Sequence, residues 1–171
     1  MTTTRYDRQM YAVMNDRRAA AAYATPARRR LLVTLHVALT VVGAGAWIAT
    51  VFGPGYGPAV AIAVVMLPWV VLTGMLNGST RGLLELRGRM LDERQLVERD
   101  RVRALSHRVT LWLLVAAAAG AGTYSTLTDA PVRAAVTPVL VGVLVVHWIM
   151  PLWVAGLRVQ DDLADEVADE A

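Results

Sequence analysis

The sequence predicts an all-α polytopic membrane protein, and two features of the chain carry this prediction. Four long apolar runs each approach the roughly 20 residues that a helix needs to cross the hydrocarbon of a bilayer. The arginines lie almost entirely on alternate sides of these runs. Only helices and closed barrels satisfy every backbone group in lipid, and long runs without alternation indicate helices. The predicted transmembrane spans are residues 31–52, 58–76, 109–127 and 132–157.

Composition narrows the class of protein further. Of the 171 residues 56% are hydrophobic, and they are concentrated in the four runs, so we expect one transmembrane bundle and no water-soluble core. Every basic residue is Arg, which is typical of a GC-rich bacterial genome. The absence of Cys excludes disulfides, thiolate nucleophiles and cysteine metal sites. We therefore expect a multi-pass protein of a bacterial inner membrane.

The placement of arginine also predicts the orientation of the chain. Basic residues near the ends of spans are retained in the cytoplasm, whereas uncharged loops cross the membrane. Residues 1–30 and 77–108 hold nearly all of the 17 basic residues, while the loops 53–57 and 128–131 hold none. Both termini and the arginine-rich hairpin, residues 77–108, are thus predicted to be cytoplasmic. An acidic cytoplasmic tail, residues 158–171, follows the last span.

Residues 1–30 form a cytoplasmic arm that has two interpretations. Tyr6, Met10, Val13 and Met14 recur at helical spacing, which favours a short amphipathic helix on the inner leaflet. The alternative is a disordered arm that only fixes the topology. The arm is polar, so residues 31–52 are expected to be an uncleaved signal anchor rather than a signal peptide.

Two features of the spans predict a packed bundle. On the third span, Ala116 with Gly120 and Ala118 with Gly122 form small-xxx-small pairs, so this helix is expected to lie in a packed interface. Three prolines within the second and fourth spans each remove a backbone donor and are expected to kink their helices: Pro68, Pro138 and Pro151. Three tryptophans are expected in the inner interfacial belt: Trp112, Trp148 and Trp153.

The arginine-rich hairpin contains a capping pattern. Asp92 is followed three residues later by Gln95, so the Asp92 side chain can accept the Gln95 amide while Gln95 reaches back to Asp92. The third helix is therefore predicted to begin near Glu93 and to extend into the cytoplasm. A solvated charged face and a docking surface for anionic lipid or an acidic partner both remain open. The candidate docking or capping residues are Asp92, Glu93, Arg94, Gln95, Arg99 and Arg101.

This stretch resembles a known pattern. The sequence Leu91-Asp92-Glu93-Arg94-Gln95, followed by Arg99-Asp100-Arg101 and by His107-Arg108, resembles the juxtamembrane motif of small uncharacterised actinobacterial four-helix integral membrane proteins. The resemblance implies a membrane location and a four-helix topology, and that family has no established activity to carry over. His107 replaces the usual aromatic residue ahead of the last arginine of the motif.

We expect two ionisable side chains within the membrane, those of His36 and His147. Placing such a group in hydrocarbon costs free energy, so each is a candidate for a functional role. Two histidines on different helices could ligate a haem or relay protons. Their depths differ by roughly one helical turn, however, which disfavours haem ligation. The alternative is a neutral histidine that donates to a carbonyl freed by Pro151 or to Thr40 or Thr137. We expect no cofactor and no metal.

No catalytic or phosphate-binding motif is present, so we expect a protein that is not an enzyme. The leading hypothesis is an accessory or regulatory subunit that docks partners or anionic lipid through the arginine-rich hairpin. The alternative is a small homo-oligomeric transporter or channel, favoured by the likeness of 66–70 to 150–154, which hints at a duplicated pair of helices. A haem-bearing redox protein is the third hypothesis. The expected partners are membrane lipid, a cytoplasmic protein and further copies of the chain, and no nucleic acid.

Overall fold

The structure, a computed structural model, describes residues 4–15, 22–52, 55–128 and 132–158. Within these ranges the chain forms five α-helices and one short 3₁₀ turn: α1 (Arg5–Met14), α3 (Pro26–Phe52), α4 (Gly57–Ser79), η1 (Gly88–Met90), α5 (Glu93–Thr128) and α6 (Val132–Arg158). The helices α3, α4, α5 and α6 are long and apolar enough to cross a membrane. The prediction of an all-α membrane protein with four candidate spans is therefore confirmed.

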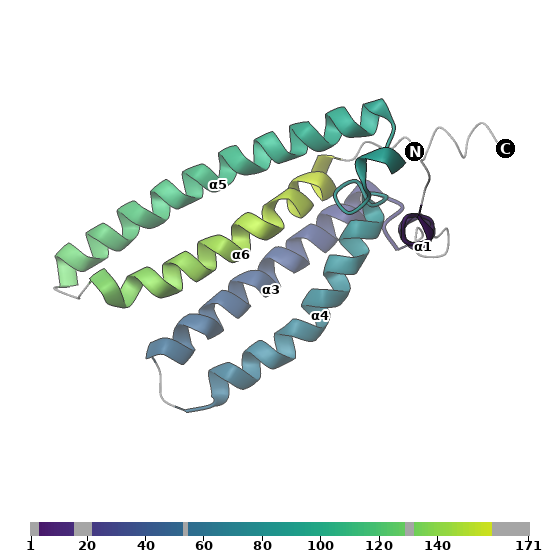
Figure 1. Cartoon of the computed structure of the whole chain (residues 1–171). Coiled ribbons are helices and arrows are strands. Elements are labelled where there is room, and N and C mark those ends of the chain that lie inside the picture. The colour runs from purple at the N-terminus through teal and green to yellow at the C-terminus, as the bar shows by residue number, and fades with distance from the viewer. Residues whose placement is uncertain (1–3, 16–21, 53–54, 129–131, 159–171) are drawn as a thin grey trace.

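The four long helices lie side by side as two antiparallel pairs (Figure 1). One pair is α3 with α4, and the other is α5 with α6. Helix α6 joins the pairs because it packs on α3 and on α4, whereas α5 packs mainly on α6. Residues 111–116 of α5 are all exposed. The bundle is therefore open along α5.

Buried side chains gather at the end of the bundle where α3 begins and where α4 and α6 end, which we call the core end (Figure 1). The core consists of Tyr23, Leu32, Val33, Leu76, Leu83, Val102, Ile149, Met150, Leu152, Trp153, Val154 and Ala155. Towards the opposite end most side chains of the spans are exposed. Lipid tails are as apolar as leucine, so such surfaces gain little from packing on one another. The core end is where the chain itself holds its helices together.

The helix boundaries have local causes. Thr25 precedes α3, and its hydroxyl accepts a hydrogen bond from the Arg28 N–H at 3.3 Å. Pro26 occupies the first helical position, where its missing N–H has no cost. Helix α3 thus begins ahead of the predicted span 31–52. Helix α4 curves along its length in Figure 1, and Pro68 within it removes one backbone hydrogen bond.

The small residues of the third span, which are predicted to lie in a packed interface, do not face another helix of this chain. Ala116, Ala118, Gly120 and Gly122 are all exposed. A Cβ added to either glycine would meet nothing within 4 Å. Helix α5 instead buries a different face, which carries Val102, Ser106 and Thr110. Spacing alone identified a close-packing surface but not whether the chain supplies a neighbour for it.

The cytoplasmic arm predicted from the sequence contains helix α1, so its helical interpretation is the correct one for residues 5–14. Helix α1 lies at the core end beside α4 (Figure 1). Its predicted position on the inner leaflet stays a prediction. Residues 159–171, which hold the acidic tail apart from Arg158, lie outside the described residues.

Candidate functional site

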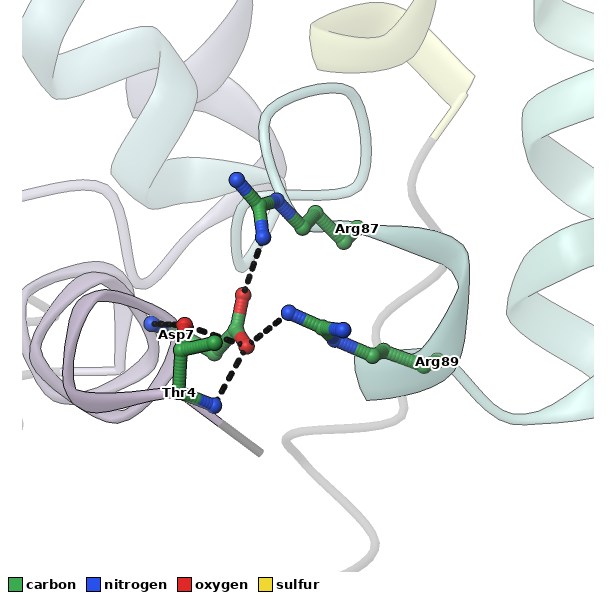
Figure 2. A network of polar contacts seen from close by, with 4 residues as sticks. All are labelled: Thr4, Asp7, Arg87 and Arg89. Atoms are coloured by element: carbon green, nitrogen blue, oxygen red, sulfur yellow. Dashed lines mark hydrogen bonds and ion pairs between the residues drawn. The ribbon is translucent and has the colours of Figure 1, made fainter. Parts of the chain in front are cut away.

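Asp7 of α1 is the centre of a polar network that joins the arm to the α4–α5 connection, residues 80–92 (Figure 2). The Thr4 backbone N–H donates to Oδ2 of Asp7 at 2.8 Å, and the Thr4 hydroxyl donates to the same oxygen at 2.7 Å. In return, the Asp7 N–H donates to the Thr4 hydroxyl at 3.3 Å. This reciprocal arrangement is a capping box, and it fixes both the start of α1 and the direction of the Asp7 carboxylate.

Two arginines of the α4–α5 connection meet this carboxylate from the other side (Figure 2). Nη2 of Arg89 donates to Oδ2 of Asp7, and Nη1 of Arg87 lies 3.7 Å from Oδ1. The Arg87 guanidinium also lies 5.5 Å from the centroid of the Tyr6 ring, within the range of a cation–π contact. The Asp7 side chain is 1% exposed, whereas that of Arg87 is 57% exposed. The connection therefore holds a buried carboxylate with arginines that remain partly open to solvent.

These contacts determine the protonation of Asp7. Hydrogen bonds from the Thr4 hydroxyl and the Thr4 backbone lower the pKa of Asp7 from 3.8 to about 2, with Arg89 acting in the same direction and burial opposing them. The pKa in the folded chain thus lies below that in the unfolded chain, so the ionised carboxylate favours the folded arm, chiefly through the cap of α1 and also through Arg89. This contribution is complete above a pH of about 4 and is lost as the pH falls through about 2.

We expect Asp7→Asn to loosen α1 at neutral pH. The amide has one acceptor oxygen where the carboxylate has two, one facing each arginine, and it carries no negative charge. Cleavage of the arm by a protease in detergent should become several-fold faster, and the wild-type arm should loosen in the same way between pH 4 and pH 2. Asp100→Asn, at an exposed position on α5, removes the same charge and is the matched control. Equal cleavage of the Asp7 and Asp100 variants at neutral pH would contradict the role of Asp7.

The shape of the connection brings its arginines to α1. Arg81 and Gly82 both have positive φ, at 50° and 71°, which turns the chain sharply after α4. A Cβ added to Gly82 would lie 2.9 Å from Cγ of Met14 and 3.0 Å from Cγ of Leu86. Leu83 anchors the connection on the core end, and Leu86 and Leu91 are buried as well. Glycine is therefore required at position 82 both for the turn and for the close approach of α1.

Asp92 and Gln95 have the reciprocal geometry expected from their spacing. The Gln95 N–H donates to Oδ1 of Asp92 at 2.7 Å, and the Asp92 N–H donates to Oε1 of Gln95 at 3.1 Å. Helix α5 then begins at Glu93 and continues without interruption to Thr128. Asp92 therefore caps the start of α5. A docking role for Asp92 would have to use the same carboxylate that forms this cap.

The other candidate docking residues are not brought together into one site. Arg99 is half-buried: its Nη1 lies 3.5 Å from the Leu86 carbonyl oxygen, and its Nε is buried with no hydrogen-bond partner among the described residues. It thus packs on the α4–α5 connection. Glu93, Arg94 and Arg101 are exposed on α5. Their docking role stays a prediction.

Asp92→Ala is expected to lower the free energy of unfolding by about 1 kcal/mol, because it removes the side-chain acceptor at the start of α5. Asp92→Asn and Asp92→Ser keep an acceptor oxygen and should be nearly neutral. Thermal unfolding of the three variants in detergent measures the difference. If a partner instead binds the Asp92 carboxylate, Asp92→Asn and Asp92→Ala should weaken partner binding equally, and the melting temperature of the chain should hardly change.

His36 is fully buried and connects three helices by hydrogen bonds. The Trp153 indole N–H of α6 donates to Nδ1 of His36 at 2.8 Å, and Nε2 of His36 lies 2.9 Å from the Thr73 hydroxyl of α4. Thr73 is in turn 2.8 Å from the Trp69 carbonyl oxygen. The indole N–H of Trp69 donates to the Thr40 hydroxyl at 3.0 Å, and Thr40 donates to the His36 carbonyl oxygen at 2.8 Å.

The network determines the tautomer of His36. An indole N–H can only donate, so Nδ1 of His36 must be the acceptor and carries no proton. In a neutral ring Nε2 then holds the proton and donates to Thr73, whose hydroxyl hydrogen goes to the Trp69 carbonyl. Each polar side chain of this closed network has its partner within the chain. Trp153 is therefore a buried structural residue, and its predicted place in the interfacial belt is wrong.

His147 is in a different environment. It lies on α6 with its side chain exposed, and no hydrogen-bond partner for it exists among the described residues. Because both ring nitrogens of His36 are occupied by Trp153 and Thr73, His36 and His147 do not form a shared pair of haem ligands. His36 is a neutral structural histidine, as one alternative held, but it bonds Thr73 rather than Thr40 or Thr137.

Sequence reasoning missed Asp7, Arg87 and Arg89 as a site. The spacing of Thr4 and Asp7 matches a capping box and could have placed the start of α1. Nothing in the sequence pairs Asp7 with Arg87 and Arg89, which lie 80 and 82 positions further along. Among the described residues, no group of three or more His, Asp or Glu side chains is placed to hold a metal ion.

Comparison with known proteins found no match to any family model, any curated protein or any solved structure. The pattern of residues 91–108 therefore stands as a resemblance alone.

Proposed function

We propose that this chain is a non-enzymatic accessory or regulatory subunit of a bacterial inner membrane, and that its arginine-rich hairpin docks an acidic helical segment of a partner protein. The observation that carries the proposal is the pairing of Arg87 and Arg89 with a carboxylate that a helix presents. The guanidinium group suits carboxylates because its planar donors match two acceptor oxygens. Helix α1 is then the occupant of this site in the isolated chain.

The charge pattern supports a cytoplasmic position for this site. The α4–α5 connection and the arm are rich in arginine, whereas residues 53–57 and 128–131 contain no basic residue. With this orientation both termini face the cytoplasm, where a soluble partner or the cytoplasmic part of a membrane partner can reach Arg87. Anionic lipid is the competing ligand for the same arginines.

The alternative of a homo-oligomeric transporter or channel has less support. Such a protein needs polar side chains along a path, and His36, Thr40 and Thr73 are instead bonded to one another at the core end. Exposed apolar surface on α5 is compatible with oligomers but does not supply a polar lining.

The test is site-specific photo-cross-linking in cells from position 85, an exposed position on the α4–α5 connection two residues before Arg87. We expect a cross-linked partner band that becomes stronger with Asp7→Asn, because the resident carboxylate is gone, and that disappears with Arg87→Gln and Arg89→Gln together. Arg158→Gln, an exposed arginine at the end of α6 and outside the arginine-rich hairpin, is the control and should leave the band unchanged. A band insensitive to the double substitution would refute the docking site. Binding of anionic lipid can be measured in nanodiscs without any partner protein. Lipid binding that is lost in the double arginine variant, without a partner band in cells, would identify the ligand of the site as lipid rather than protein.

A further inference from the structure

One face of α6 combines an unpaired polar group with exposed apolar side chains. A groove of about 560 Å³ is lined by Leu144, Val145, His147, Trp148 and Pro151. Leu144 and Trp148 are 66% and 73% exposed. His147 lies near the middle of the candidate span Val136–Arg158, at the depth where a polar side chain is most costly.

Pro151 creates a second unpaired group at the same place. Its ring nitrogen has no hydrogen, so the carbonyl of His147, four residues earlier, loses its helical donor. His147 and Pro151 both line the groove, so the imidazole and the freed carbonyl belong to one face of α6. In lipid each of these groups needs a partner, because no water is there to provide one.

The spacing of this face is that of a helix-packing seam. Leu140, Leu144, His147 and Pro151 follow one another at intervals of four, three and four residues, the repeat by which two helices interdigitate. A single polar residue within such a seam fixes the register and the number of helices. Leu140 is exposed as well, so no helix of this chain covers the seam there.

We propose that this face of α6 is the interface of a parallel homodimer in which the imidazole N–H of each His147 donates to the freed His147 carbonyl of the other copy. Two copies inserted in one membrane share an orientation, so their two-fold axis is parallel to the membrane normal and each residue meets its own counterpart at the same depth. A neutral imidazole with a free carbonyl beside it offers a donor and an acceptor, which makes the face self-complementary. A lipid tail covers the apolar part and leaves both polar groups unpaired.

The absence of cysteine from the chain permits a direct test in native membranes. Leu144→Cys is expected to give a disulfide-linked dimer on oxidation with iodine. Val64→Cys is the matched control, because Val64 is 64% exposed and lies about as far from the end of α4 as Leu144 does from the end of α6. It should give little dimer, and so should Ala116→Cys on the exposed face of α5.

Substitution of His147 then tests the hydrogen bonds. In the Leu144→Cys background, His147→Leu should reduce the rate of cross-linking at least about fivefold, while His147→Asn, which keeps a donor, should reduce it less. An unchanged melting temperature of the His147→Leu chain in detergent would show that the fold is intact. Cross-linking that is no stronger than in Val64→Cys, that does not respond to His147→Leu, or that appears at Ala116→Cys instead would overturn the proposal. The groove would then hold a lipid or a lipid-soluble ligand, or α5 would be the interface.

Discussion

Replacing His36 with alanine is expected to lower the free energy of unfolding by about 3 kcal/mol. Two interhelical hydrogen bonds are lost, to Trp153 and to Thr73, and such bonds contribute about 0.6 to 2 kcal/mol each in membranes. The remainder comes from the cavity, because a fully buried ring is removed from contact with Trp69 and Trp153. Both effects act where α3, α4 and α6 meet, so the helices should separate at the core end.

Matched substitutions at Thr73 separate hydrogen bonding from packing. Thr73→Ser keeps the hydroxyl that pairs with Nε2 of His36, whereas Thr73→Val keeps the shape and removes the hydroxyl. We expect Thr73→Val to cost about 1 kcal/mol and Thr73→Ser less. The stability of His36→Ala, Thr73→Ser and Thr73→Val is measured by unfolding in a titration of denaturing detergent, followed by circular dichroism. Equal stability of Thr73→Val and wild type would show that the network contributes no net stability.

The same His36→Ala protein tests the redox hypothesis. We expect wild type and variant to be equally colourless, because both nitrogens of His36 are engaged by the chain. A Soret band in the wild type that disappears in the variant would make haem binding the primary function.

Replacing Gly82 with alanine is expected to cost about 2 to 3 kcal/mol. A φ of 71° is strained for a residue with a side chain, at about 1 to 2 kcal/mol, and the new Cβ would lie 2.9 Å from Cγ of Met14. Met14 belongs to α1, so the arm should be displaced from the α4–α5 connection before the bundle unfolds. Faster hydrogen exchange in α1 with unchanged exchange in α5 is the expected signature.

Two further variants identify the cause. Gly120→Ala places the same methyl group in open space on α5 and should be neutral. Adding Met14→Ala to Gly82→Ala should restore the part of the loss due to the close approach, and leave the part due to backbone strain. If the double variant is no more stable than Gly82→Ala, the contact with Met14 is not what requires glycine.

The sequence was sufficient to predict those features of the fold that depend on a single helix. The candidate spans follow from apolar runs, and the start of α5 follows from Asp92 and Gln95, which lie within one turn of each other. It was not sufficient where the outcome depends on which helix lies beside which. The burial of Trp153 and the exposure of Gly120 both follow from the order in which α5, α6 and α3 pack, and no local pattern encodes that order.

The candidate site shows the same division. Thr4 and Asp7 are close in sequence, and their capping box could be anticipated. The arginines that complete the site could not, because positive charge is abundant throughout residues 77–108 and only the turn at Arg81 and Gly82 selects Arg87 and Arg89. His36 was recognised as unusual, but its partners on α4 and α6 depend on the assembled bundle.

The hydrogen bond between Trp153 and His36 joins the last long helix to the first across 117 positions of sequence. During synthesis α3 leaves the ribosome long before α6, so His36 enters the bilayer without its final partner. A chain that lacks α6 therefore leaves Nδ1 of His36 without its hydrogen-bond donor, while Nε2 can still pair with Thr73 of α4. The buried polar network is thus satisfied only once the last long helix has packed against the first.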